Sequence, residues 1–339
     1  MAPRMPGEYE PHERTVMCWP ARHDLWRHHI GDAEAAYAEV AAAIAAFEPV
    51  TMIAAPGAAE RAAQRCGDKV DVVELPIDDS WFRDSGPTYV FDEGELIAVD
   101  WVFNSWGERY LPYAADAAIA ARWAASAGHA TRQVPLVLEG GSITVDGEGT
   151  LVTTEQCLLH PNRNPSMTRT EISAALGEQL GVSTVVWLPH GLALDGDTDG
   201  HVDNVAAFAR PGVLLVQGCD DPGEEDWLRC NVNARCARGT VDAAGRPLEV
   251  IEVPVLPFTV YGGERVVVPY LNFSLVNGGV IVPTCGHRAD TEMLAVIADQ
   301  FPGREVVGID VGAVLAHGGG GIHCITQQMP RSGSAMRPE

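Results

Sequence analysis

A repeated succession of local patterns constrains the fold of this chain more than any other feature of its sequence. A helix-forming stretch is followed by a strand rich in β-branched residues, then by a loop with polar side chains, and then by a hairpin turn. Strands of this kind lie at 71–76, 137–138, 184–189 and 305–308. Because each polar loop takes the same place in its unit, about five such units predict a circular array whose loops converge on one axis. An ordinary open α/β sheet is the alternative.

Turn and cap residues mark the elements between these loops. Glycine-containing hairpin turns lie at 92–94, 146–149, 210–212 and 277–279. Helices are expected at 32–47, 58–65, 114–127, 168–180 and 290–301, with Asp32 as the N-cap of the first. Because the sequence contains no clear linker, we expect a single domain from residue 5 to 330 and a flexible tail from 331 to 339.

Charge and cysteine content narrow the functional classes. The formal net charge of −23 argues against binding to nucleic acids or to anionic membranes. It suits a small cationic substrate, although solubility or a salt-tolerant host explains it more simply. The eight cysteines form no Cys-x-x-Cys pair and no disulfide-dense pattern, and no apolar run reaches the length of a membrane span. We therefore expect a cytoplasmic protein.

Cys324 is the strongest candidate nucleophile. It follows closely on four consecutive glycines, Gly318–Gly321, in the segment 317–328. Glycines let the backbone turn tightly and approach a ligand closely. A thiol at the end of such a loop, beside polar groups, is placed like a nucleophile. The alternative is a small buried hydrophobic residue, which is the usual environment of a free cysteine.

His201 and Asp203 form a second candidate pair. On an extended strand, positions two apart point to the same face, so both side chains can line one pocket. The acidic run 195–200 resembles the start of an EF-hand calcium loop, but its twelfth position is Ala206, where a glutamate is required. A zinc site on His201 and Asp203 lacks further ligands at a suitable spacing. The sequence therefore favours neither metal, and its glycine runs match neither the dinucleotide fingerprint nor the P-loop.

The candidate polar residues together indicate a cationic substrate. They are Asp84, Glu139, His201, Asp203 and Cys324. An ordinary cysteine hydrolase needs a thiol, a histidine and one orienting group. Two further carboxylates are costly to bury unless a cation neutralises them, and the planar guanidinium pairs well with carboxylates. The set therefore predicts a pocket in which a thiol attacks a guanidinium carbon.

Motifs along nearly the whole chain resemble those of the agmatine deiminases, in the guanidine-modifying (pentein) superfamily. They include WFRDSGP at 81–87, LEGGS at 138–142, GHVDN at 200–204 and GIHCITQQ at 321–328, with further matches at 5–13, 19–20, 103–107 and 158–165. The resemblance implies an α/β fold, a five-bladed α/β propeller with a pseudo-fivefold repeat of strand, hairpin and helix. Bacterial peptidylarginine deiminase-like proteins share most of these motifs, which therefore specify the fold better than the substrate.

The resemblance also implies a reaction and a role for each residue. A hydrolase acting on a linear amidine C–N bond would convert agmatine to N-carbamoylputrescine and ammonia, a step toward putrescine. Cys324 would form a thiouronium intermediate, Asp84 and Asp203 would hold the guanidinium nitrogens, and His201 would act as acid and then base. Glu139 would orient His201. No metal ion or organic cofactor is implied.

Other positions bear on substrate fit. Trp81 and Trp106 are candidates for the walls of the substrate slot, although a place in the buried core suits either. Glu8 is a candidate partner for the distal amine of the substrate. Ser274 stands where the resemblance leads us to expect tyrosine, which would alter the pocket if that position reaches it.

The sequence leaves three alternatives open. The first is a deiminase of arginine, peptidyl-arginine or another guanidino compound. The second is an amidinotransferase, which passes the amidino group to an amine and not to water. The third is a guanidine-binding protein without catalytic activity, although the presence of all the candidate polar residues argues against it. Whether the chain forms a homo-oligomer is also left open.

Overall fold

The computed structural model describes residues 2–332, so all but the first two positions of the expected tail lie outside the described residues. Four three-stranded sheets in this range share one pattern, an antiparallel hairpin followed by a parallel third strand. They consist of β4 (Thr88–Asp92), β5 (Glu95–Val102) and β6 (Ala130–Val137); β7 (Ile143–Val145), β8 (Thr150–Thr154) and β9 (Thr184–Leu188); β10 (Ala206–Arg210), β11 (Val213–Gln217) and β12 (Glu249–Val253); and β15 (Ser274–Val276), β16 (Gly279–Pro283) and β17 (Glu305–Ile309). All four expected hairpin turns join the first two strands of these sheets and are confirmed.

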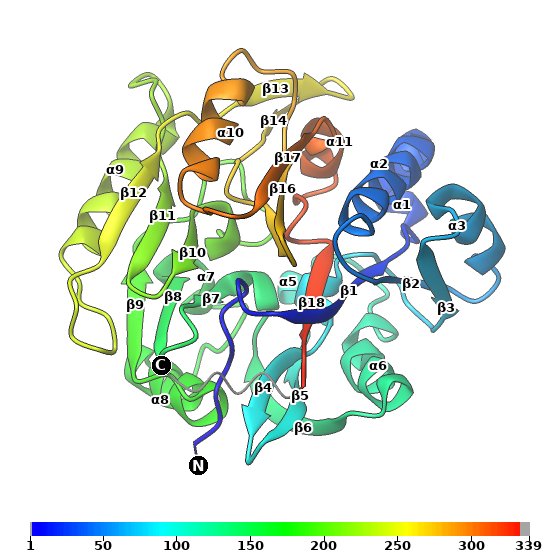
Figure 1. Ribbon diagram of the computed structural model, residues 1–339, viewed down its shortest axis with the longest axis horizontal. Helices are drawn as coiled ribbons and strands as arrows, with labels where there is room; N and C mark the ends of the chain where they lie inside the picture. Colours follow the sequence, from blue (N-terminus) through cyan, green and yellow to red (C-terminus); the bar gives the residue numbers. More distant parts are fainter. Residues whose placement is uncertain (1, 333–339) are drawn as a thin grey trace.

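The two ends of the described chain meet in a further sheet. There β1 (His12–Cys18) pairs antiparallel with β18 (Thr326–Pro330) and parallel with β2 (Val50–Ala54), and β3 (Val70–Glu74) extends the sheet. A separate hairpin consists of β13 (Phe258–Tyr261) and β14 (Glu264–Val267). Figure 1 shows the sheets following one another around the molecule, with the longer helices toward the outside.

The helices connect the second and third strands of the sheets or lie in the loops that follow. They are α1 (His23–Trp26), α2 (Ile30–Ile44), α3 (Ala59–Cys66), α4 (Phe82–Ser85), α5 (Ser105–Glu108), α6 (Ile119–Ala127), α7 (Glu155–Leu158), α8 (Arg169–Leu180), α9 (Glu225–Arg238), α10 (Asp290–Ala298) and α11 (Gly312–His317). Short 3-10 turns are η1 (Arg27–His29), η2 (Asp116–Ala118), η3 (Gly140–Ser142) and η4 (Val202–Asn204). The five helices expected from the sequence correspond to α2, α3, α6, α8 and α10.

Local chemistry sets the helix boundaries. Thr168 and Glu171 form a reciprocal capping box at the start of α8, and Gly181 ends this helix in the left-handed conformation. The N-cap predicted at Asp32 was wrong, because η1 leads directly into α2 and the N-cap is His29. Asp32 lies instead in the first turn, where its carboxylate accepts a hydrogen bond of 2.7 Å from the Tyr261 hydroxyl.

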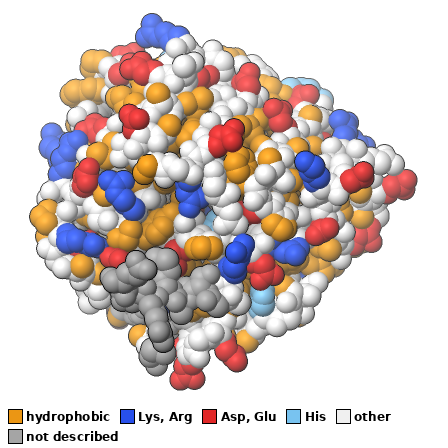
Figure 2. All heavy atoms as spheres, in the orientation of Figure 1, with side chains coloured by type: hydrophobic (Ala, Val, Ile, Leu, Met, Phe, Trp, Pro, Cys, Tyr) orange, Lys and Arg blue, Asp and Glu red, His pale blue; other side chains and the backbone are white. Residues whose placement is uncertain are grey.

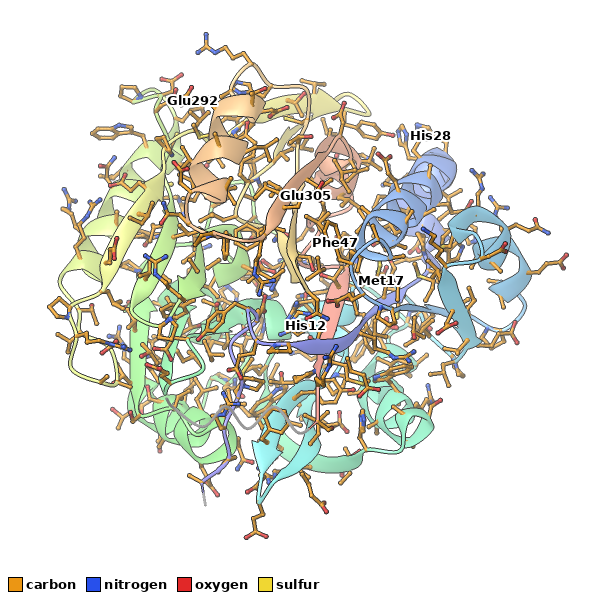
Figure 3. All side chains as sticks on the ribbon, viewed as in Figure 1. His12, Met17, His28, Phe47, Glu292 and Glu305 are labelled. Atoms are coloured by element: carbon orange, nitrogen blue, oxygen red, sulfur yellow. The ribbon has the colours of Figure 1, made fainter. Side chains whose placement is uncertain are left out.

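The apolar cluster between α2 and the N-terminal sheet extends to residues in the polar loops. Tyr37 and Ile44 on α2 are fully buried in one apolar cluster with Met17 on β1, and Figure 3 shows side chains filling the space between the sheets. Each such burial contributes about 1.5–3 kcal/mol. Trp81 and Cys324 belong to the same cluster, so the core fixes the positions of two candidate site residues.

The described surface mixes charge and apolar groups. Figure 2 shows acidic, basic and hydrophobic side chains interspersed over one face of the molecule. No helix within residues 2–332 combines the length and apolar character that a membrane crossing requires.

Candidate active site

The polar residues singled out in the sequence come from loops that follow the parallel third strands. Asp84 lies in α4 after β3, Glu139 lies between β6 and η3, and Cys324 lies between α11 and β18. His201 and Asp203 lie after β9, but the extended conformation predicted for them was wrong, because Val202–Asn204 forms the 3-10 turn η4. The turn nevertheless directs both side chains toward Gly141.

Gly141 shows how closely these groups approach one another. A Cβ atom at this position would lie 2.6 Å from His201 Nδ1, 2.8 Å from Asp84 Oδ1 and 2.9 Å from Asp203 Oδ2. Any side chain here would therefore push the three groups apart. Glycine is required because the backbone itself passes through the site.

Asp84 is held by two donors. Its Oδ1 accepts a hydrogen bond of 2.9 Å from the Gly141 backbone N–H, and its Oδ2 accepts one of 3.0 Å from the Trp106 indole N–H. Burial raises the pKa of this carboxyl to about 6, and the nearby Asp203 and Glu139 carboxylates add to this effect while His201 opposes it. The free site therefore resists a full set of negative charges and favours the arrival of a cation.

A left-handed turn delivers the Trp106 indole to Asp84. Ser105, Trp106 and Glu108 have φ values of 54°, 54° and 60°, and Gly107 has a φ of 89°. Left-handed backbone costs L-residues roughly 1–2 kcal/mol each, so the surrounding structure must hold this turn in place. Asn104 contributes by accepting a hydrogen bond of 2.9 Å from the Gly107 N–H.

Glu139 links His201 to a buried arginine. Glu139 Oε2 lies 3.8 Å from His201 Nε2, and Glu139 Oε1 lies 2.7 Å from Arg163 Nε. Burial opposes ionisation of Glu139, but the Arg163 guanidinium outweighs it and lowers the pKa of this carboxyl. Burial also opposes charging of His201, but Asp84, Cys157 and Glu139 raise its pKa well above the ordinary value. The structure therefore favours an imidazolium facing carboxylates on two sides.

Cys157 is a further group beside His201. Potential ligand atoms of Glu139, Cys157 and His201 lie within 4.8 Å of one another, which is close enough to hold a metal ion. The Arg163 guanidinium against Glu139 would repel a cation there. This arrangement also excludes Asp203, so it differs from the His201 and Asp203 pair considered from the sequence.

The Cys324 thiol lies against Asp203 and Asn272. Its Sγ is 3.4 Å from Asp203 Oδ2, to which it donates, and Asn272 Nδ2 donates to Sγ over 3.2 Å. The residue is only 2 % exposed. Burial, together with the Asp203 and Asp84 carboxylates, raises the thiol pKa well above its ordinary value. The free site therefore holds a protonated thiol, and an added positive charge would favour the thiolate.

A narrow cavity opens onto this thiol. Its lining consists of Trp81, Asp84, Trp106, Tyr110, Asp197, Thr198, Gly318, Gly319 and Cys324. Trp81 stacks on Trp26 with the ring centroids 6.1 Å apart, so the core supports this wall. A Cβ atom on Gly320 would lie 2.6 Å from the Trp81 ring, so a side chain at this position would displace that ring.

Some residues considered from the sequence lie elsewhere. Glu8 contacts Arg83 and His323 and does not line the cavity. Ser274 lies on β15 and is likewise absent from the cavity lining, so its difference from the expected tyrosine does not reach the slot directly.

Asn272 and Arg163 were not predicted as site residues. Arg163 contacts Glu139 from a loop that the sequence does not place beside it. The repeat could have indicated Asn272, because a fourth polar loop is required between the hairpins at 210–212 and 277–279.

Comparison with known families identifies the chain. The family model of the Porphyromonas-type peptidyl-arginine deiminases matches residues 4–330. The chain belongs to this family. The agmatine deiminase of Pseudomonas aeruginosa (strain LESB58) is 44% identical over 353 residues, which cover 96% of this chain and 95% of the relative. A protein from Streptomyces coelicolor described as a putative agmatine deiminase is 45% identical and covers 97% and 99% of the two chains.

Solved structures of family members and of more distant proteins share the fold. An agmatine deiminase of Enterococcus faecalis superposes with a TM-score of 0.93 at 34% identity, over 98% of this chain and 96% of the other. The inosamine-phosphate amidinotransferase of Streptomyces griseus superposes with a TM-score of 0.53 at 15% identity, over 98% and 97%, and shows a likeness of fold alone. The fold is therefore one that these deiminases and this amidinotransferase share.

Proposed function

We propose that this deiminase family member hydrolyses agmatine to N-carbamoylputrescine and ammonia through a covalent thiouronium intermediate on Cys324. The observation that carries the proposal is the small cavity in which a buried thiol lies among carboxylates. The relatives named agmatine deiminase, at 44% identity and similar values, support the choice of substrate.

The arginines near the cavity support a substrate without a carboxylate. Arg83 pairs with Glu8 and Arg163 pairs with Glu139. Arg109 lies 3.3 Å from an oxygen of Asp199. A free arginine substrate would bring a carboxylate toward acidic groups, while these guanidinium groups are already engaged.

The first half of the proposed reaction forms the covalent bond. The substrate guanidinium would enter between Asp84 and Asp203, and its positive charge would lower the pKa of the Cys324 thiol, whose proton would pass to solvent. The thiolate would then attack the guanidinium carbon and form a C–S bond. His201, as imidazolium, would donate a proton to the departing nitrogen, and the C–N bond would break with release of ammonia.

The second half of the proposed reaction hydrolyses the intermediate. The neutral His201 would accept a proton from a water molecule, whose oxygen would attack the thiouronium carbon. Collapse of the adduct would break the C–S bond and transfer the hydroxyl proton to the departing sulfur, which would regenerate the Cys324 thiol and leave a ureido product. Glu139, paired with Arg163, would hold His201 in place and favour its protonated form between the two halves.

Asp197 is the better candidate for binding the distal amine. It lines the cavity, and its side chain is 44% exposed. Its Oδ1 accepts a hydrogen bond of 2.8 Å from the Tyr110 hydroxyl, which orients the carboxylate, while Arg109 lies 3.9 Å away. Trp81 and Trp106 would pack against the aliphatic chain of the substrate between the two charged ends.

The sheets support a finer description of the fold. We propose that the four three-stranded sheets and the sheet joining β1 to β18 are the five blades of the propeller, and that residues 5–330 form one domain. The shared strand pattern and the family match over residues 4–330 support this description. A cytoplasmic location and a role toward putrescine stay predictions.

Peptidyl-arginine is the second candidate substrate, because the matching family model carries that description. The narrow cavity, walled by Trp81 and Trp106, disfavours a peptide backbone. Ammonia release from agmatine, free arginine, a blocked arginine peptide and a longer guanidino-amine tests both. We expect agmatine to exceed arginine in kcat/KM by at least about two orders of magnitude, roughly 3 kcal/mol. Equal or better turnover of arginine would overturn the substrate assignment.

A further inference from the structure

His323 directly precedes Cys324 in the sequence, but its side chain contacts Asp203 and Glu8. Its Nδ1 lies 2.9 Å from Asp203 Oδ2, and its Nε2 lies 3.0 Å from Glu8 Oε1. The residue is 6% exposed and does not line the cavity beside Cys324. A single imidazole therefore joins the proposed guanidinium ligand to a carboxylate from the N-terminal loop.

We propose that His323 and Glu8 are positioning residues that hold Asp203 ionised and oriented toward the substrate. The inference rests on the proposed deiminase reaction, and it assigns these two residues a function outside the cavity. Neither residue would touch the reacting atoms. Both would act through the Asp203 carboxylate.

Hydrogen bonding leaves Asp203 with one oxygen for the substrate. Oδ2 accepts from His323 and from the Cys324 thiol, whereas Oδ1 is buried and has no hydrogen-bond partner among the described residues. A buried hydrogen-bond acceptor without a partner destabilises the protein unless a ligand donates a hydrogen bond to it. An N–H of the guanidinium would donate to Oδ1, while the hydrogen bond from His323 to Oδ2 prevents the carboxylate from rotating away.

The charges around His323 favour its protonated form. Burial and the nearby Arg83 guanidinium oppose protonation, but Glu8 and Asp203 outweigh them and raise the pKa of His323 above its ordinary value. Burial opposes ionisation of Asp203, but His323, with help from His201 and the Cys324 thiol, lowers its pKa. Asp84 behaves in the opposite way, with its pKa raised to about 6. Asp203 is therefore the carboxylate that is already charged when the substrate arrives.

The N-terminal loop fixes Glu8 in this arrangement. Arg83 lies 3.1 Å from Glu8 Oε1, and His12 Nε2 lies 2.8 Å from the Glu8 carbonyl oxygen. Figure 3 shows His12 near the middle of the molecule, at the start of β1. Glu10, in the same loop, accepts a hydrogen bond of 2.9 Å from the Gly7 N–H and does not contact His323. Glu10 thus provides a control for damage to the loop itself.

The test compares Glu8→Gln and His323→Gln with the control Glu10→Gln. Glu8→Gln keeps the shape of the side chain but removes the charge that favours the imidazolium, so His323 should lose its proton at a lower pH. We expect kcat/KM for agmatine at neutral pH to fall about tenfold, and the alkaline limb of its pH profile to move down by about one unit. His323→Gln should lose the contribution of His323 to that limb, while the limb set by His201 remains, and Glu10→Gln should keep the wild-type profile.

A second measurement does not depend on activity. The pH titration of the His323 ring protons by NMR, assigned by their loss in His323→Gln, should give a pKa above 6.5 in wild type and a lower one in Glu8→Gln. A wild-type pKa of 6.5 or below overturns the inference, as does a Glu8→Gln pH profile identical to that of wild type. Failure of wild type to release ammonia from agmatine overturns the proposed function instead, and the NMR titration still decides whether Glu8 controls His323.

Discussion

Replacing Asp84 by asparagine separates catalysis from stability in this site. The substitution keeps the shape of the side chain and removes the charge that would face the guanidinium. Loss of one partner from a buried ion pair costs about 3–5 kcal/mol, which corresponds to a decrease of roughly two to three and a half orders of magnitude in kcat/KM. The Asn amide also replaces one acceptor with a donor, opposite either the Gly141 N–H or the Trp106 indole N–H.

The same substitution should change the pH dependence of folding. The pKa of Asp84 is raised to about 6 from a model-peptide value of 3.8, so the folded protein holds this proton more tightly than the unfolded chain. The resulting stabilisation is fully present below pH 3.8 and is lost as the pH rises through 6. Asp84→Asn removes this contribution, so its thermal stability should fall less than that of wild type between pH 4 and 7.

Steady-state ammonia release and thermal unfolding at several pH values measure the two effects. Asp100→Asn is a matched control, because Asp100 is a buried aspartate with a raised pKa that lies outside the cavity beside Cys324. We expect this control to keep most of the activity. A loss below about tenfold in kcat/KM for Asp84→Asn, roughly 1.4 kcal/mol, would refute its assignment as a guanidinium ligand.

Further predictions concern the nucleophile, the distal amine and metals. Cys324→Ser should abolish ammonia release while keeping the fold, because a hydroxyl is a far weaker nucleophile than a thiolate; circular dichroism and the ammonia assay check both. Asp197→Asn should raise KM for agmatine about tenfold with little change in kcat. Butylguanidine lacks the amine, so its KM should stay unchanged. Steady-state kinetics with both substrates measure these values, and an unchanged KM for agmatine or a raised KM for butylguanidine would contradict the assignment. Exhaustive chelation should leave activity unchanged, and loss of activity that zinc restores would instead assign a metal to Glu139, Cys157 and His201.

Residues that carry the chemistry could be identified from sequence because they lie in short, ordered motifs at repeated places. The strand before each loop has a clear β-branched pattern, so Asp84, Glu139 and Cys324 could be assigned to equivalent loops. Their mutual geometry depends on contacts between distant segments. The Arg83 backbone N–H, for example, donates to the Cys324 carbonyl over 3.2 Å, which ties two of these loops together.

Other features depended on contacts that no local pattern reveals. The helix α9 was not predicted, because its buried positions Cys230, Asn233, Ala234 and Ala237 are small or polar and give little helical periodicity. Glu8 was considered as a ligand of the distal amine, but only the folded chain shows that Arg83 and His323 already occupy its carboxylate. Asp197 lies within the acidic run that resembled a calcium loop, and only the folded chain brings it against Gly319 at the cavity.

Acid-quenched mass spectrometry during turnover tests covalent catalysis most directly. Wild-type protein mixed with excess agmatine should carry an adduct with the mass of agmatine less ammonia on the peptide that contains Cys324, and the adduct should disappear when the substrate is exhausted. Cys324→Ser should show neither adduct nor turnover. Turnover by Cys324→Ser, or a transient adduct on Cys157 in place of Cys324, would contradict the proposed mechanism.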